Sequence, residues 1–221
     1  MTDSFLDDEP PLIIHDSGVV FQEQGGASFA VEAFHGVVRA SGEPITLHVT
    51  SVKGGRPGAV CAVVLPGSIS DEGSAGDAGH LDGYRYLLAR HWRVATNQWE
   101  WEFPRGMGEI GETPEQTAVR ELREETALEV SEDAVSILQV IHADTGILRD
   151  AIAVARIRLD DSRHNRKFAG MHKPQGSDWK LEHFRWIGAQ EFLEAVAHGE
   201  IVDGITLSAF LVCEAARLQR R

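Results

Sequence analysis

The sequence predicts an α/β (α+β) protein in which a small β-rich arm precedes a larger domain of strands and helices. Short runs rich in Val, Phe, Thr and Ile, separated by Gly- and Pro-containing breaks, fill residues 19–52 and predict an antiparallel sheet. Beyond them, apolar strand-like runs alternate with helical segments. We therefore expect an arm at 17–55 and a larger domain at 56–221. Residues 1–16 are acidic, contain proline and lack periodicity, which predicts a mobile leader.

The larger domain is expected to hold a sheet, one central helix and two C-terminal helices. Two polar stretches interrupt it, a Gly-rich loop at 68–83 and a second loop at 160–180. The strands are predicted at 59–66, 84–90, 97–104, 135–143, 151–159 and 183–187, and the C-terminal helices at 189–198 and 203–219.

The composition excludes several classes of protein. A formal charge of −13 opposes broad capture of nucleic acid, because phosphates would be repelled by most of the surface. The two cysteines, Cys61 and Cys213, lie in apolar runs and are expected to be buried thiols rather than a disulfide. No apolar run approaches the ~20 residues that span a bilayer, and the N-terminus lacks a secretory pattern. We expect a soluble, cytoplasmic protein that binds neither nucleic acid nor membrane.

The central helix has a well-marked start and an unusual distribution of acidic residues. Thr113 suits the N-cap, Pro114 the first turn, and Gln116 completes a capping box, so the helix should run to about Thr126. At ~100° per residue, Glu121 and Glu125 fall on the same side as the core-facing residues. At ~4 Å and an effective dielectric of ~20, a partly buried pair of like charges costs on the order of 4 kcal/mol. A hard divalent cation with oxygen ligands, most simply Mg²⁺, would relieve this repulsion.

The stretch GMGEIGETPEQTAVRELREETAL resembles the Nudix signature GX5EX7REUXEEXGU at eight of nine defined positions. The matching residues are Gly106, Glu112, Arg120, Glu121, Leu122, Glu124, Glu125 and Leu128. The ninth position is Ala127, where the family usually has glycine. Because a left-handed helix end costs a non-glycine residue about 1 kcal/mol or more, the turn is expected to differ here.

The resemblance implies a Nudix α/β/α sandwich with a mixed sheet and a metal-dependent pyrophosphohydrolase activity. It implies Mg²⁺, replaceable by Mn²⁺, bound by Glu121 and Glu125, with Glu124 as a further direct or water-mediated ligand. The backbone carbonyl of Arg105 or Gly106 is a further candidate ligand. The roles of Arg120 and Glu112 would be to position the carboxylates and the loop. The family often draws its general base from a downstream loop, and Asp178 and Glu182 are the candidates here, although each could be a solvated acid.

The order of β arm, RPGAVCAVVLP, YLLARHWR, WEFPRG, Nudix helix and DTGILRD is similar to the ADP-ribose pyrophosphatase group. That resemblance implies a homodimer, in which the arm contributes to dimerisation and to the substrate pocket, and ADP-ribose as substrate. Arg93, Trp101 and Arg105 are candidate substrate-binding residues. Trp99 is an alternative base-stacking residue, although at least one of the two tryptophans is expected to be structural.

Three readings of the function remain open at this stage. The first is a hydrolase of ADP-ribose, another nucleotide sugar or a dinucleotide. The second is a Nudix-like sensor that binds a nucleotide without cutting it, and the third is a CoA or capped-RNA pyrophosphatase. The loop at 160–180 carries His164, Arg166, Lys167, His172 and Lys173, which form either a phosphate-facing lid or a solvated loop.

Overall fold

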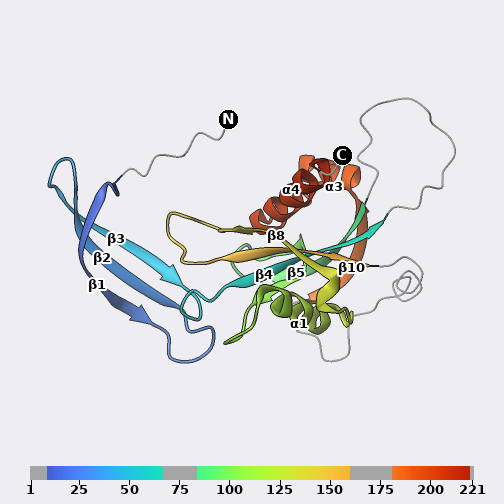
Figure 1. Cartoon of the computed structure of the whole chain (residues 1–221), viewed down its shortest axis with the longest axis horizontal. Helices are drawn as coiled ribbons and strands as arrows, with labels where there is room; N and C mark the ends of the chain where they lie inside the picture. Colours follow the sequence, from blue (N-terminus) through green and yellow to red (C-terminus); the bar gives the residue numbers. More distant parts are fainter. Residues whose placement is uncertain (1–8, 67–83, 160–180, 220–221) are drawn as a thin grey trace. The chain divides into compact units, whose positions relative to one another are not determined.

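The computed structural model describes residues 9–66, 84–159 and 181–219. It divides into two compact units, one formed by Met1–Arg56 with Asp144–Asp150 and the other by Pro57–Ala143 with Ala151–Arg221. The first is called the arm and the second the sheet domain. Figure 1 shows both, with the strands of the arm in blue.

The arm is a three-stranded antiparallel sheet in the order β1-β2-β3. Its strands are β1 (Leu12–Gln22), β2 (Ala30–Val38) and β3 (Pro44–Ser51). β1 begins inside the stretch expected to be a leader, because Leu12 already pairs with Val38. The expected leader therefore extends too far, and residues 1–8 lie outside the described part of the chain.

The segment Asp144–Asp150 belongs to the arm although it is distant from it in the sequence. The backbone N–H of Thr50 donates to the carbonyl oxygen of Ile147 at 2.7 Å, and Arg149 forms an ion pair with Glu32 at 2.8 Å. This return of the chain could not be predicted from the sequence, since nothing local in the segment indicates its distant partner.

The sheet domain is built on a mixed sheet, as predicted, with the main order β10-β5-β4-β9-β8. β4 and β9 are parallel and the other neighbours are antiparallel, while β6 pairs with β5 and β7 pairs with β4. The strands are β4 (Gly58–Pro66), β5 (Tyr84–Arg93), β6 (Gln98–Glu102), β7 (Arg105–Met107), β8 (Val135–Ile141), β9 (Ile152–Arg158) and β10 (Leu181–Gly188).

Helices cover both faces of this sheet, as Figure 1 shows for α1 and α4. The helices are α1 (Pro114–Thr126), α3 (Ala189–Ala197) and α4 (Gly204–Leu218), with a short 3-10 turn η1 (Glu132–Ala134). Side chains of β4 alternate between the faces, so that Cys61 and Val63 pack with Leu122 of α1 whereas Val60 and Ala62 pack with α3 and α4. The expected α/β/α arrangement is confirmed.

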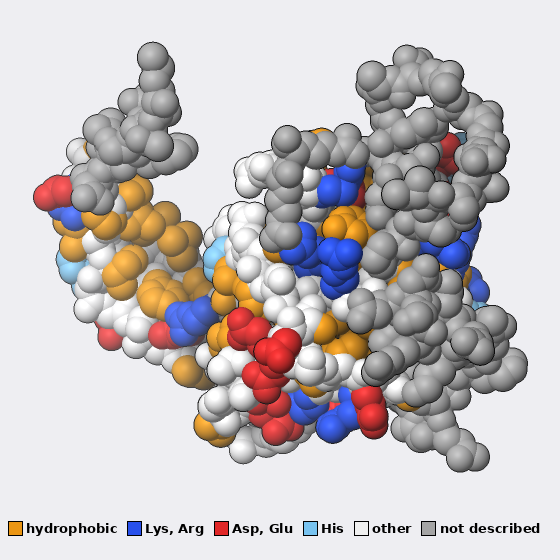
Figure 2. All heavy atoms as spheres, turned by 45° about the vertical axis from the view of Figure 1, so that its right-hand side comes forward, with side chains coloured by type: hydrophobic (Ala, Val, Ile, Leu, Met, Phe, Trp, Pro, Cys, Tyr) orange, Lys and Arg blue, Asp and Glu red, His pale blue; other side chains and the backbone are white. Residues whose placement is uncertain are grey.

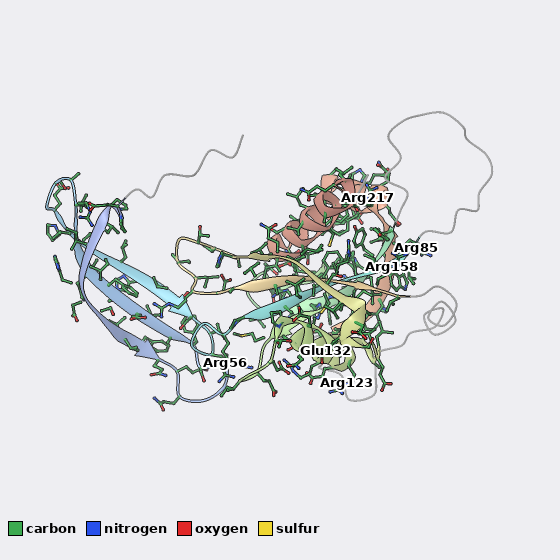
Figure 3. The ribbon with its side chains drawn as sticks, viewed as in Figure 1. Arg56, Arg85, Arg123, Glu132, Arg158 and Arg217 are labelled. Atoms are coloured by element: carbon green, nitrogen blue, oxygen red, sulfur yellow. The ribbon has the colours of Figure 1, made fainter. Side chains whose placement is uncertain are left out.

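The α4 side of the core combines aromatic rings with a buried polar contact. The rings of Phe192 and Phe210 are stacked with centroids 3.9 Å apart, and Tyr86 meets Phe210 edge-on. The hydroxyl of Tyr86 donates to Glu214 at 2.5 Å, and Arg217, labelled in Figure 3, donates to the same carboxylate at 2.8 Å. These contacts fix α4 on the sheet.

Both cysteines, Cys61 and Cys213, are buried free thiols, as predicted. Among the described residues, no helix is long and apolar enough to cross a membrane.

Candidate functional site

The helix α1 begins and ends where its sequence indicates. The Thr113 hydroxyl accepts from the backbone N–H of Gln116, and the Gln116 side chain accepts from the backbone N–H of Thr113, so the predicted capping box is present. Ala127 adopts the left-handed conformation at the end of the helix, with φ 56° and ψ 21°. The expectation that the turn would differ is therefore wrong: alanine accepts the conformation that favours glycine, at an energetic cost.

The glutamates of α1 divide between its core side and its solvent side. The side chains of Glu121 and Glu125 are 12% and 22% exposed, whereas that of Glu124 is 53% exposed. Arg123, labelled on α1 in Figure 3, is exposed. Two carboxylates thus lie against the domain rather than on the hydrated face of the helix, as the helical spacing predicts.

Glycine at position 106 makes room for one of these carboxylates. A Cβ atom added to Gly106 would lie 2.1 Å from the Cδ and Oε2 atoms of Glu121, so that this carboxylate would have to shift. The pairing of β4 with β7 is also tight, since a Cβ atom added to Gly58 would lie 2.7 Å from the carbonyl oxygen of Gly106. The carboxylate of Glu121 therefore rests directly on the backbone of β7.

Arg120 joins the loop before α1 to the glutamates of the helix. Its guanidinium donates to Glu112 at 2.8 and 2.9 Å, to Glu121 at 2.8 Å and to Glu124 at 3.2 Å. It also donates to the carbonyl oxygen of Met107 at 2.9 Å. One cation thus contacts three carboxylates and the backbone next to Gly106.

Glu125 is held by a different pair of donors. The backbone N–H of Arg105 donates to Oε2 at 3.0 Å, and the Nε2 atom of His91 lies 3.3 Å from Oε1. The side chain of His91, on β5, is 5% exposed. The sequence did not lead us to predict His91 as part of this site. Its one signal there is its position, two residues after Ala89, at the end of a buried run.

Burial and neighbouring charges act in opposite directions on two of these acids. Burial raises the pKa of Glu121; the hydrogen bond and charge of Arg120 oppose this, and the charges of Glu125 and Glu124 add to it. The hydrogen bonds from Arg120 are the main reason why the pKa of Glu112 falls to about 2. Glu121 is therefore short of positive charge, whereas Glu112 is well compensated.

A second set of charges lies at the ends of β5 and β6. Glu102 is fully buried and accepts hydrogen bonds from Arg93, at 2.6 Å from Nε to Oε1, and from Nε of Arg105 at 3.1 Å. Arg105 also reaches Asp203, the N-cap of α4, at 3.4 Å. Burial by itself would raise the pKa of Glu102, but the hydrogen bond of Arg93 and the charges of Arg105 and Arg93 lower it.

These contacts bear on the two arginines expected to bind substrate. The side chains of Arg93 and Arg105 are 31% and 23% exposed, and both are bound to Glu102. The structure brings them together and next to the Glu125 contact through the backbone of Arg105. Each is thus held by a buried carboxylate while part of its surface stays accessible.

The two tryptophans of β6 have different surroundings. Trp101 is partly buried against the core on the α4 side of the sheet. The ring of Trp99 meets Trp92 edge-on with centroids 5.6 Å apart, and the guanidinium of Arg90 lies 5.9 Å from its centroid. Trp101, which we expected to bind substrate, packs against the core.

The structure does not bring Glu182 together with the α1 glutamates. Glu182 lies opposite Arg90 across β10 and β5 and accepts from it at 3.1 Å. Successive side chains of a strand point to opposite faces, and His91, the next residue of β5, contacts Glu125. The other candidate base, Asp178, and the basic loop residues His164, Arg166, Lys167, His172 and Lys173 lie outside the described residues.

Within the ranges that the structure describes, no three acidic, histidine or cysteine side chains converge as a ready-made group of metal ligands. The oxygens of Glu121 and Glu125 are instead engaged by Arg120, by His91 and by a backbone amide. Oxygen donors at this position suit a hard divalent cation. The missing side chain of Gly106 lets the carboxylate of Glu121 lie on the backbone of β7.

Comparisons with known proteins give one family and one fold. A model of the NUDIX domain matches residues 80–203, more than half of the chain. No curated protein matches. Among solved structures, one described as "Crystal structure of ADP compounds hydrolase" is similar with a TM-score of 0.65 and 14% identity, over 97% of this chain and 98% of that one. At that identity the likeness shows the fold alone.

Proposed function

Because the chain belongs to the NUDIX domain family and is a Nudix pyrophosphohydrolase, we propose that it cleaves, with Mg²⁺, the pyrophosphate of a nucleoside diphosphate linked to another group. The best candidate reaction converts ADP-ribose to AMP and ribose 5-phosphate. The observation that carries the proposal is the pair of partly buried glutamates, Glu121 and Glu125, beside the backbone of Gly106.

The charge balance at α1 supports a divalent cation there. Burial raises the pKa of Glu121, and among the described residues the one guanidinium in contact with it, that of Arg120, is shared with Glu112 and Glu124. In our proposal Glu121, Glu125 and Glu124 hold Mg²⁺, for which Mn²⁺ can substitute, with the carbonyl of Arg105 or Gly106 as a further ligand. When bound, the metal lowers the pKa of a water molecule and neutralises the oxygens of the pyrophosphate.

The residues of the chain itself place the reacting groups. Arg120 fixes the glutamates and the loop carbonyl of Met107. Arg93 and Arg105, clamped by Glu102, present the remaining surface of two cations to an anionic phosphate. For the general base we favour Asp178 over Glu182, because Glu182 is paired with Arg90 on the other face of the sheet from His91.

A product assay tests the proposed reaction. Purified full-length protein is incubated with ADP-ribose, other nucleotide sugars, dinucleotides, CoA and capped RNA, with Mg²⁺, Mn²⁺ or a chelator. We expect metal-dependent release of AMP and ribose 5-phosphate from ADP-ribose, and a loss of turnover of about 100-fold or more in Glu125→Gln. The matched control is Glu129→Gln, an exposed glutamate just after the helix. Unchanged turnover in Glu125→Gln would rule out this site.

The same set of substrates distinguishes the proposed hydrolase from the alternative functions. A nucleotide sugar that binds tightly in the presence of metal and yields no product over a long incubation would indicate a sensor. Preferential cleavage of CoA or capped RNA would keep the chemistry and change the substrate. The full set of glutamates on α1 favours hydrolysis over sensing.

The arm suggests a second proposal, that the protein forms a homodimer through the arm, whose strands then contribute to the substrate pocket. β1 is an edge strand, and its apolar residues Val19, Val20 and Phe21 are 60%, 60% and 54% exposed. Figure 2 shows hydrophobic side chains over the surface of the arm. Such a patch is typical of a protein interface. Light scattering coupled to gel filtration should give twice the chain mass for the wild type and the chain mass for Val20→Glu; a monomeric wild type contradicts the proposal.

A further inference from the structure

The carboxylate of Glu125 is fixed at both of its oxygens, and the two donors come from different strands. The backbone N–H of Arg105, on β7, donates to Oε2, and the imidazole of His91, on β5, meets Oε1. The first donor belongs to the backbone and would be present with any non-proline residue at position 105. The second depends on the side chain at position 91.

The direction of the His91 contact follows from the chemistry of its partner. An ionised carboxylate only accepts hydrogen bonds, so the Nε2 atom of His91 must carry the hydrogen. The other ring nitrogen, Nδ1, is buried and has no hydrogen-bond partner among the residues that the structure describes. A buried polar atom without a partner destabilises the folded state, so His91 is a costly residue at this position.

Among the described residues, the surroundings of His91 offer its imidazole no hydrogen-bond partner besides Glu125. Of its neighbours on the same face of β5, Leu87 and Ala89 are apolar and fully buried, and Arg93 is bound to Glu102. Glu100 lies opposite His91 across β5 and β6, but its carboxylate accepts from the hydroxyl of Thr96 at 2.9 Å. Within the described part of the chain, the one hydrogen bond of the His91 side chain is therefore with Glu125.

We propose that His91 is a positioning residue that fixes the carboxylate of Glu125 for metal binding. The inference rests on the proposed function, in which Glu125 is a metal ligand, and adds a residue that the Nudix motif does not contain. Each carboxylate oxygen can accept a second interaction, so Glu125 can be held by His91 and Arg105 while facing a cation. Loss of such an outer contact typically weakens metal affinity by about 10–100-fold.

The test measures Mn²⁺ binding to the full chain without substrate, by electron paramagnetic resonance of free Mn²⁺. We expect His91→Leu and His91→Asn to bind Mn²⁺ about 10–100-fold more weakly than wild type. His91→Gln should recover most of the affinity, because its amide nitrogen stands where Nε2 stood whereas that of asparagine does not. The control His48→Leu alters an exposed histidine of β3 and should bind Mn²⁺ like wild type.

Kinetics and stability provide the second readout. At a limiting Mg²⁺ concentration the turnover of His91→Asn should fall, and at saturating Mg²⁺ the KM for the nucleotide should stay close to wild type. Thermal unfolding without metal identifies any variant that fails to fold, and the comparison of asparagine with glutamine remains informative if His91→Leu does not fold.

The outcomes separate the two proposals. If Glu125→Gln binds Mn²⁺ weakly but His91→Asn and His91→Leu bind it like wild type, the positioning role of His91 is overturned and the metal site stands. If Glu125→Gln binds Mn²⁺ as tightly as wild type, the metal site itself is overturned, and the inference about His91 with it.

Discussion

The sheet domain holds two groups of buried or half-buried carboxylates, and they differ in how many arginines serve them. At the ends of β5 and β6, the single carboxylate of Glu102 is bound by two arginines, Arg93 and Arg105. On α1, the single guanidinium of Arg120 is shared among Glu112, Glu121 and Glu124. Glu102 is thus compensated by positive charge within the protein, and so is Glu112, whereas Glu121 lacks sufficient positive charge around it.

The pKa shifts follow this difference. The pKa of Glu102 is lowered in spite of complete burial, because its arginine partners outweigh desolvation. The pKa of Glu121 is raised, because burial and the neighbouring glutamates outweigh Arg120. A carboxylate of the first kind stabilises the fold without help, while a carboxylate of the second kind gains from a bound cation. The comparison supports a scaffold role for Glu102 and the proposed metal-binding role for Glu121.

The largest expected effect comes from neutralising Glu102. The substitution Glu102→Gln leaves Arg93 without its carboxylate partner and Arg105 with Asp203 alone, and breaking a pair that involves a buried charge typically costs about 3–5 kcal/mol. Urea unfolding without metal should show this loss, and Glu129→Gln should unfold like wild type. A loss below about 1 kcal/mol would mean that Glu102 is not the residue that holds the arginines.

The pH dependence of the free energy of unfolding also tests the contribution of Glu102. Because the folded state lowers the pKa of Glu102 below its ordinary 4.5, its contribution is present above that pH and is lost as the pH falls through the lowered value. Urea unfolding between about pH 5 and 3 should therefore depend less steeply on pH in Glu102→Gln than in wild type. Equal slopes would show that Glu102 does not contribute to acid unfolding.

A Cβ atom at position 106 should affect the second group alone. In Gly106→Ala the methyl group would overlap the carboxylate of Glu121, which must move away from β7. Overpacking of this kind costs about 1–3 kcal/mol, and we expect Mn²⁺ affinity to fall by about tenfold or more. Calorimetry gives both quantities. Unchanged Mn²⁺ affinity would exclude the backbone of β7 as part of the metal site.

A change at the end of α1 alters conformation without altering charge. Ala127 occupies the left-handed region with φ 56°, so Ala127→Gly should stabilise the fold by about 1 kcal/mol. Thermal unfolding should show the gain, with Mn²⁺ affinity unchanged. A parallel gain in Mn²⁺ affinity would show that the helix end, and not only the charge balance, limits the site.

The smallest effect on stability is expected at Glu121. Its raised pKa means that Glu121→Gln removes an unfavourable charge together with a hydrogen bond to Arg120, so the metal-free free energy of unfolding should change by less than about 1 kcal/mol. The rise in Tm on adding Mg²⁺ should disappear. A loss as large as that of Glu102→Gln would abolish the distinction between the two groups.

Local sequence was sufficient to predict much of α1 and its glutamates. The residues of the capping box are three apart in the chain, and the faces of a helix follow from its period, so Thr113, Glu121 and Glu125 could be placed in advance. The strands of the sheet were predicted in the same way, from apolar runs between Gly and Pro breaks.

The contacts that organise the site across strands could not be predicted in this way. His91 meets Glu125, and Arg93 meets Glu102, because the register of β5 with β6 and the packing of α1 bring them together. The apolar periodicity of a strand or helix predicts which side of that element a residue occupies, but it does not predict which residue of another element will contact it. For the same reason Glu182 was expected near the site, although its position opposite Arg90 places it on the other face of β5.

The aromatic contacts of α4 determine how much of the chain behaves as one cooperative folding unit. The NUDIX match ends at residue 203, yet Phe210 and Glu214 of α4 complete the packing around Tyr86, and Arg105 reaches the N-cap of the same helix. Hydrogen exchange in α4 should therefore report global unfolding rather than local fraying. A fragment that stops at the limit of the family match would lack one wall of its hydrophobic core.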